Sequence, residues 1–304
     1  MLVGELLRRN GSRELSRPKM PENAVAQTGN YIGTYRRLKM MRQGKTCQIW
    51  ETIRSSDNKR CVLKVLRDEF RTDKGELTML KHEYIVGSEL THPNCIEVYE
   101  YDVARGIPFT AIEYFRSLNL KQWIREPDSN REWLPSIIEQ SAKGIVHLHS
   151  KGWIHRDLKP DNLLVNDKGE VKLIDFAIAQ KAKKGLGKLF GGKAKIAGTR
   201  SYMSPEQIRG EALDARADIY SFGCLLFELC SGKLPFTGTS SDDLLQRHLK
   251  SPIPSLTAFS DDVNPSLAKL VERMMSKKRD DRHETVEQFY HDFKKIRLPF
   301  GRAK

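Results

Sequence analysis

Apolar residues follow two different spacings along the chain. In the stretches 134–148 and 219–229 they recur at helical spacing, which predicts two helices. The second stretch is apolar over much of its circumference and is therefore expected to be a central, buried helix. From Tyr31 onward the pattern is one of short apolar runs between turns, such as 61–66 and 108–115, which predict strands.

One stretch, residues 153–177, places polar side chains around two short apolar runs. The runs Leu163–Val165 and Val171–Ile174 flank a turn at 166–169 and predict a hairpin of two strands. The hairpin would fix the distance between two polar loops, whose candidate residues are His155, Asp157, Lys159, Asn162 and Asp175. Phosphoryl transfer needs such a set: one carboxylate orients a hydroxyl, while an amide and a second carboxylate hold Mg²⁺ on a triphosphate.

The run at 155–162, His-Arg-Asp-Leu-Lys-Pro-Asp-Asn, followed by Asp175-Phe176, closely resembles the catalytic and metal-binding loops of protein kinases. Lys159 resembles the serine/threonine branch of that family rather than the tyrosine branch. The resemblance covers about residues 33–296 and implies a two-lobed α+β fold.

The implied domains are a small β-rich N-lobe at 31–115 and a larger, mainly helical C-lobe at 116–298. Residues 1–30 and 299–304 are expected to be tails. The first tail should be flexible, because it mixes Arg, Ser, Pro, Asn and Gly with little periodicity.

By this resemblance, the function would be transfer of the ATP γ-phosphate to serine and threonine hydroxyls of proteins, with Mg²⁺ or Mn²⁺. Asp157 would orient the acceptor hydroxyl, and Lys159 would steady the transferring phosphate. Asn162 and Asp175 would hold the metal, while Lys64 would contact the α- and β-phosphates.

Lys64 stands inside an apolar run, where a lysine taken alone marks an edge strand about as often as a functional site. In the resemblance it pairs with a glutamate on the following helix. Counting back from the helix exit at 90–94, Leu-Thr-His-Pro-Asn, selects Glu83, with Glu76 and Glu89 as alternatives.

The resemblance also implies a nucleotide site. Backbone groups of Glu113 and Phe115 would face the adenine, with Ile112 behind it. The other expected nucleotide-binding residues are Met41, Gly44, Ile49, Val62, Lys64 and Leu164. An ordinary core strand would have the same apolar residues, so these assignments depend on the flanking motifs.

The glycine-rich loop of the family is poorly matched. Of its three glycines only Gly44 is present, and Arg42 and Cys47 replace the others. Because Cβ atoms keep backbone amides away from phosphates, we expect a stiffer lid with fewer close amide contacts. Alternatively, the charge of Arg42 itself contacts phosphate.

Two further positions differ from the family. Gly87, one helical turn after Glu83, stands where a large apolar residue packs against Phe176, so we expect a gap that leucine would fill with a gain of basal activity. Ala177 replaces the glycine after Asp-Phe. Together with the altered loop, these differences favour an alternative function, a pseudokinase that binds a nucleotide or a partner and acts as a regulatory module.

The segment Gly198–Glu206 resembles the substrate-docking element of the family, which disfavours a small-molecule kinase. Asp218 matches a buried aspartate that supports the catalytic loop, and Arg282 matches an arginine that pairs with Glu206. The roles expected for Asp218, Arg282 and Glu206 are structural rather than chemical.

The net charge is +13, and it is concentrated in two windows without acidic residues, 31–45 and 181–200. Only three aromatic residues accompany these windows, so nucleic-acid binding is disfavoured. From Ala177 to Gly198 there is no Ser, Thr or Tyr, so Arg156 has no evident phosphorylated partner. Acidic protein substrates would therefore dock on the basic segment Lys181–Arg200, unless the segment is merely a solvated loop.

The five cysteines, Cys47, Cys61, Cys95, Cys224 and Cys230, form no C-x-x-C pair. This argues against a disulfide framework or a zinc site and predicts a reducing cytoplasm. No apolar run is long enough to span a bilayer, and charged residues interrupt any signal-peptide core near the start.

Overall fold

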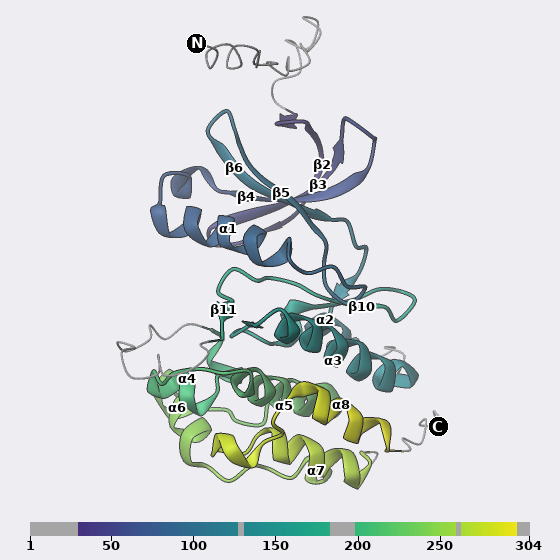
Figure 1. Cartoon of the computed structure of the whole chain (residues 1–304), viewed down its shortest axis with the longest axis vertical. Coiled ribbons are helices and arrows are strands. Elements are labelled where there is room, and N and C mark those ends of the chain that lie inside the picture. Colours follow the sequence, from purple (N-terminus) through teal and green to yellow (C-terminus); the bar gives the residue numbers. More distant parts are fainter. Residues whose placement is uncertain (1–29, 127–130, 183–197, 260–262, 297–304) are drawn as a thin grey trace, which may run out of the picture.

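The computed structural model describes residues 30–126, 131–182, 198–259 and 263–296. A curled sheet occupies one end of the molecule and a helical part the other (Figure 1). The predicted two-lobed α+β arrangement is confirmed. Apart from Asn30, the predicted tails at 1–30 and 299–304 lie outside the described residues, and so does most of the basic segment 181–200.

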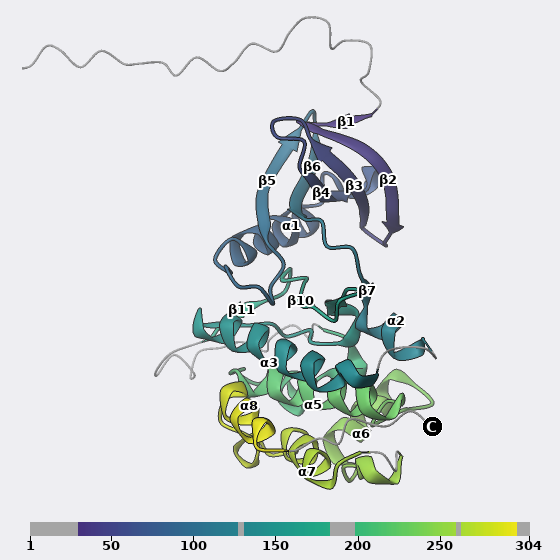
Figure 2. The ribbon, with the colours of Figure 1, turned by 90° about the vertical axis from the view of Figure 1, so that its right-hand side faces the viewer.

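The sheet is antiparallel and its six strands follow the order β1-β2-β3-β4-β6-β5 (Figure 2). Its strands are β1 (Tyr31–Ile32), β2 (Tyr35–Gln43), β3 (Cys47–Arg54), β4 (Arg60–Leu66), β5 (Val98–Ala104) and β6 (Ile107–Glu113). Strand β4 lies between β3 and β6, so Lys64 is on an interior strand and the edge-strand interpretation is wrong. Its neighbours Leu63 and Val65 are buried in the core of this sheet with Phe109.

Helix α1 (Lys74–Gly87) packs on the sheet against β5 and β6. It begins after Asp73, whose carboxylate accepts hydrogen bonds from the backbone N–H groups of Gly75 and Glu76. The buried Thr110 hydroxyl of β6 donates to the carbonyl of Leu80 at 3.3 Å. These contacts fix the helix so that Glu83 is buried beside the sheet.

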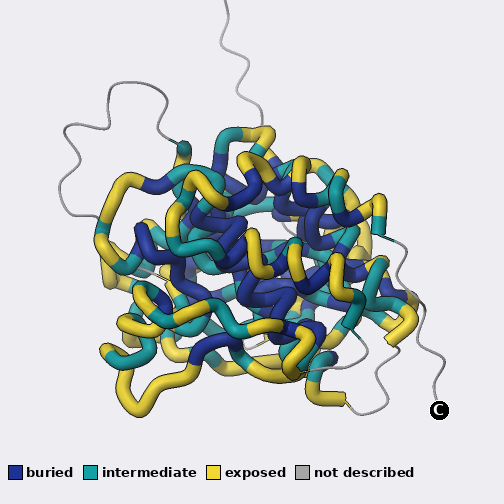
Figure 3. Tube along the Cα trace, turned by 90° about the horizontal axis from the view of Figure 1, so that it is seen from below, coloured by how far each residue is buried: buried dark blue, intermediate teal, exposed yellow. Residues whose placement is uncertain are grey.

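The helical part is built around α5, which is buried at every position from Ala217 to Cys230. Its helices are α2 (Leu120–Arg125), α3 (Leu134–Ser150), α4 (Pro205–Arg209), α5 (Arg216–Ser231), α6 (Ser241–Lys250), α7 (Pro265–Met274) and α8 (Val286–Lys294). Seen from this end, buried segments fill the centre of the trace and exposed segments surround them (Figure 3). The two helices predicted at 134–148 and 219–229 are confirmed as α3 and α5.

Two small sheets lie outside the six-stranded one, in the orders β10-β9-β7 and β11-β8. Their strands are β7 (Leu118–Asn119), β8 (Trp153–Ile154), β9 (Leu163–Val165), β10 (Val171–Leu173) and β11 (Gln180–Lys181). Strands β9 and β10 pair antiparallel, with Leu163 opposite Leu173 and Val165 opposite Val171. The predicted hairpin is confirmed, and it holds the loop before β9 next to the loop after β10.

The gap predicted beside Gly87 is wrong. A Cβ atom at Gly87 would lie 2.3 Å from Val98 Cγ2 and 2.9 Å from Val98 Cβ, and 3.5 Å from Phe176 Cδ2. Val98, from β5, already fills the space that a larger side chain on α1 would take. Glycine is therefore needed at this position for the close approach of α1 and β5.

We expect Gly87→Leu to reduce the free energy of unfolding by about 1–3 kcal/mol or more, because overpacking displaces Val98. Chemical denaturation of the variant and the wild type measures this change. Ile85→Leu is the matched control, since Ile85 lies on the same helix and is 42% exposed. A Gly87→Leu protein as stable as the wild type would contradict the close packing.

Candidate active site

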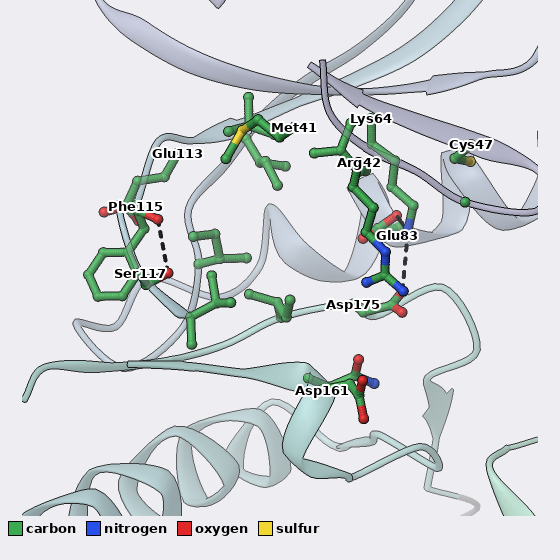
Figure 4. Close-up of a pocket in the computed structure, with 18 of the residues that line it drawn as sticks. Met41, Arg42, Cys47, Lys64, Glu83, Glu113, Phe115, Ser117, Asp161 and Asp175 are labelled. Atoms are coloured by element: carbon green, nitrogen blue, oxygen red, sulfur yellow. Dashed lines mark hydrogen bonds and ion pairs between the residues drawn. The ribbon is translucent and has the colours of Figure 1, made fainter. Parts of the chain in front are cut away.

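A cavity of about 410 Å³ is lined by residues of both the sheet and the helical part (Figure 4). All eight residues predicted to bind nucleotide line it: Met41, Gly44, Ile49, Val62, Lys64, Glu113, Phe115 and Leu164. Such a volume suits a cofactor-sized ligand.

One end of the cavity is apolar. Ile49 and Val62 of the sheet line it with Leu164 and Ile174 of the helical part. Two apolar walls contributed by different parts of the chain suit a flat aromatic base. Ile174 is a lining residue that the sequence interpretation missed, because it reads as an ordinary residue of the hairpin.

The connector after β6 borders this apolar end. The backbone N–H of Glu113 donates to the carbonyl of Glu97 at 2.9 Å, so of its backbone polar groups only its carbonyl can face a ligand. Its carboxylate pairs with Lys172 at 2.8 Å. The hydroxyl of Ser117 donates to the carbonyl of Phe115 at 3.0 Å (Figure 4). Ser117 also lines the cavity, and no sequence signal distinguished it.

The polar end of the cavity holds a buried charge cluster. Lys64 Nζ lies 2.7 Å from Glu83 Oε2 and 3.3 Å from Asp175 Oδ1. Burial opposes the positive charge, but Glu83 and Asp175 outweigh it and raise the pKa of Lys64. The Lys64 ammonium in turn holds the pKa of the Asp175 carboxyl below its ordinary value. Lys64 and Asp175 are therefore held in their charged forms, whereas burial raises the pKa of the Glu83 carboxyl.

The structure shows which of the three candidate glutamates pairs with Lys64. Glu76 lies in the first turn of α1 and does not line the cavity. Glu89 lies beyond the end of α1 and accepts hydrogen bonds from Trp153 Nε1 at 2.8 Å and Lys181 Nζ at 3.0 Å. Glu83 alone of the three contacts Lys64.

A second polar cluster surrounds Asp157. Its Oδ2 lies 2.6 Å from Lys159 Nζ, and its Oδ1 accepts the backbone N–H of Thr199 at 2.7 Å. Lys159 also donates to Thr199 Oγ1 at 2.7 Å. Asn162 Nδ2 donates to the Asp157 carbonyl at 2.9 Å and to Oδ2 at 3.3 Å. The network joins the catalytic-type loop to the predicted docking segment.

The loop before β9 is held from beneath by Asp218. Its carboxylate accepts the backbone N–H groups of His155 at 2.7 Å and Arg156 at 2.9 Å, and a hydrogen bond from His149 Nε2 at 2.8 Å. Arg156 has φ 70°, a left-handed conformation that a side chain disfavours. The fully buried Asp218 stabilises that conformation and thereby aims Asp157.

A buried ion pair anchors the docking segment. Arg282 donates from Nη1 to Glu206 Oε1 at 2.6 Å and from Nη2 to Oε2 at 2.9 Å. This bidentate geometry is the strong form of an arginine–carboxylate pair. The side chain of Ser204 caps α4 by accepting the backbone N–H of Gln207. The side-chain amide of Gln207 in turn donates to the Arg156 carbonyl at 2.9 Å.

The side chains of Asn162 and Asp175 suit a hard divalent cation. Asn162 uses its Nδ2 on Asp157, which leaves its carbonyl oxygen for another partner. Asp175 lines the cavity as a charged carboxylate. No group of three or more His, Cys, Asp or Glu that could hold a metal occurs within the described ranges. An amide and a carboxylate are nevertheless enough for Mg²⁺ bound jointly with nucleotide phosphates.

The sequence interpretation missed a contact between α1 and the segment after Asp175. His82 Nε2 hydrogen-bonds the carbonyl of Ala179 at 2.7 Å, and Lys181 lies over the Trp153 ring at 4.1 Å. With the Glu89 bonds, these contacts tie the helix that carries Glu83 to the loop that carries Asp175. The hydrogen-bonded partners in these contacts are 64 to 97 residues apart along the chain, so no local pattern indicates them.

Arg156, predicted to lack a phosphorylated partner, donates from Nη1 to the Ile178 carbonyl at 3.3 Å. Of the basic residues predicted to dock acidic substrates, only Lys181 and Arg200 are described, and Lys181 is paired with Glu89. The other lysines of that segment lie outside the described residues.

All five cysteines are free thiols. In the ranges that the structure covers, no helix has the length and apolarity needed to cross a membrane.

Residues 35–294 match the family model of the protein kinase domain. The serine/threonine-protein kinase PrkC of Bacillus subtilis is 29% identical over 264 residues, which are 86% of this chain and 40% of the relative. The serine/threonine-protein kinase pkn3 of Myxococcus xanthus is 33% identical over 276 residues, with 86% and 50% coverage. PknB of Mycolicibacterium smegmatis is 33% identical over 249 residues, with 80% and 39% coverage. The chain thus spans half or less of the length of these relatives.

Proposed function

The chain belongs to the protein kinase family, and we propose that it is an active serine/threonine kinase that transfers the ATP γ-phosphate to proteins with Mg²⁺. The observation that carries the proposal is the contact of Lys64 with both Glu83 and Asp175 at the polar end of the cavity. A strand, a helix and a loop distant in sequence supply these charges. We assign the N-lobe to 31–115 and the C-lobe to 116–298.

In this proposal the adenine lies between the apolar walls, and the phosphates extend toward Lys64. Asn162 and Asp175 would hold Mg²⁺, or Mn²⁺ in its place, and the bound metal would neutralise charge on the phosphate oxygens. Lys64 would contact the α- and β-phosphates, with Glu83 fixing its direction. The protein supplies position and charge, which are the main contributions that phosphoryl transfer requires.

Asp157 would accept the proton of the acceptor hydroxyl while that oxygen bonds to the γ-phosphorus. The bond between the γ-phosphorus and the bridging oxygen breaks at the same time, and ADP leaves. Lys159, 2.6 Å from Asp157 Oδ2, is placed to balance charge on the transferring group. The contact of Lys159 with Thr199 supports a serine/threonine rather than a tyrosine acceptor, together with the names of the relatives.

Acceptor proteins with acidic residues near the phosphorylated hydroxyl are the proposed substrates, and nucleic acid is not expected to bind. The sequence supports this proposal, because the window 181–200 holds seven basic residues and no acidic one. The free thiols support a reducing compartment such as the cytoplasm.

A regulatory pseudokinase is the second candidate. It is favoured by the altered phosphate loop, in which the backbone N–H of Gly44 already donates to the Cys47 carbonyl at 2.8 Å. Such a protein would bind nucleotide without transferring phosphate.

One assay separates the two functions. Incubation of the purified chain with γ-³²P-labelled ATP and generic acidic and basic proteins should label serine or threonine with Mg²⁺ and not with a chelator. Labelling of the acidic protein should be faster, and salt should reduce that preference by screening. ATP binding without any labelling above background would support the pseudokinase and contradict the proposed enzyme.

A further inference from the structure

The hairpin between β2 and β3 uses the amide of its glycine internally, and two of its carbonyls accept hydrogen bonds from Arg67. The Gly44 N–H donates to the Cys47 carbonyl at 2.8 Å, and a Cβ at Gly44 would lie 3.1 Å from that oxygen. Arg67 Nη1 donates to the Lys45 carbonyl at 2.9 Å, and the Arg67 N–H to the Thr46 carbonyl at 2.9 Å. The only glycine left in the loop therefore has no amide to offer a phosphate.

An exposed cationic side chain borders the cavity at this place. Arg42 lies near the end of β2, opposite Ile49 and next to a register shift after Met40. Its side chain lines the cavity and points away from the sheet, in the direction of the helical part that carries Asp175 (Figure 4). Two lysines, Lys45 and Lys64, also line the cavity, and Lys64 is engaged by Glu83 and Asp175.

The charge of Arg42 is not compensated by any carboxylate among the residues that the structure describes. Within the described part of the chain its guanidinium forms no ion pair, whereas Arg67 pairs with Glu69 at 2.5 Å. A guanidinium carries several N–H donors in a planar fork that matches two phosphate oxygens at once. It can therefore replace the Gly44 N–H, which this loop uses on itself.

We propose that Arg42 binds the β- and γ-phosphate oxygens of the nucleotide and takes over the task of the missing loop amides. The inference rests on the proposed nucleotide site and adds a residue that determines how the triphosphate is held. The direction of its side chain toward the part that carries Asp175 places it on the outer phosphates rather than on the base. Adenosine binding should thus be independent of Arg42.

Isothermal titration with ATP, ADP and adenosine tests the proposal, each in EDTA and in Mg²⁺. Arg42→Met keeps an unbranched stem similar to the aliphatic part of the arginine and removes its charge. We expect it to raise the Kd for ATP about tenfold, the Kd for ADP by less, and that for adenosine by less than about twofold. Arg36→Met is the matched control, because Arg36 is exposed on the same strand and does not line the cavity. It should leave all three values within about twofold.

Two further variants sharpen the result. Arg42→Lys should recover only part of the ATP affinity, because an ammonium lacks the planar fork. Arg42→Gly restores the glycine of the family and should still weaken ATP binding. Tighter ATP binding by Arg42→Gly would mean that the arginine obstructs the site, and it would overturn the inference.

Other outcomes are equally decisive. Unchanged ATP affinity in Arg42→Met, or an equal loss for ATP and adenosine, would overturn the role of Arg42 and leave the proposed nucleotide site intact. A wild-type protein that binds neither ATP nor adenosine would overturn the proposed function itself, and this inference with it.

Discussion

Asp157→Asn should reduce kcat by about 10²–10⁴-fold and leave the Kd for Mg·ATP within about twofold. The carboxylate contacts Lys159 and Thr199 and does not line the nucleotide cavity. It therefore acts on the acceptor hydroxyl rather than on the nucleotide. Asparagine keeps the shape of the side chain and an oxygen for the Thr199 N–H, so the protein should remain folded.

Steady-state phosphorylation gives kcat, and titration with Mg·ATP gives Kd. Asp161→Asn is the matched control, because Asp161 is on the same loop and lines the cavity without an ion pair to any described residue. It should keep most of the activity. Equal residual activity in Asp157→Asn, Asp161→Asn and the wild type would identify a contaminating kinase and leave the pseudokinase as the better explanation.

The fold could be predicted because its periodic segments are long or bounded by clear turns. The buried circumference of α5 follows directly from its run of apolar residues, and the β9–β10 hairpin follows from two apolar runs around a turn at 166–169. The candidate residues Asp157, Asn162 and Asp175 were found because fixed offsets on one short stretch specify them. Such features are local in sequence, so no tertiary information is needed.

The prediction failed where two distant segments meet. Gly87 was expected to leave a gap, but Val98 from the next strand fills it. The edge-strand alternative for Lys64 stayed open for a similar reason, because only strand pairing reveals that β4 is interior. Nor does the sequence reveal that Glu89 accepts hydrogen bonds from Trp153 and Lys181. Side-chain partners across such separations are set by packing, which one sequence does not display.

The Arg42 loop shows both limits together. Its departure from the glycine pattern was visible in the sequence, and two consequences were open: a poorer lid or a phosphate-binding arginine. The hydrogen bond from the Gly44 N–H to the Cys47 carbonyl explains why this amide is closed to phosphate. Only the direction of the Arg42 side chain into the cavity favours the second consequence.

Asp175→Asn should have a different signature from Asp157→Asn, because Asp175 lines the nucleotide cavity and contacts Lys64. We expect kcat to fall by about 10²-fold or more, and the Kd for Mg·ATP to rise about 10–100-fold. In EDTA the Kd for ATP should not rise. Removing a negative charge beside Lys64 should leave ATP affinity unchanged or improve it, since the phosphates then meet less repulsion.

The ratio of the ATP Kd in EDTA to that in Mg²⁺ isolates this effect from any general damage to the site. Asp175 has φ 67°, a conformation that asparagine tolerates as well as aspartate, so the backbone should not change. Asp157→Asn serves as the control, because it should keep the wild-type ratio while losing turnover. If Mg²⁺ improves ATP binding equally in Asp175→Asn and the wild type, Asp175 does not hold the metal. In that case its contact with Lys64 has a structural role only.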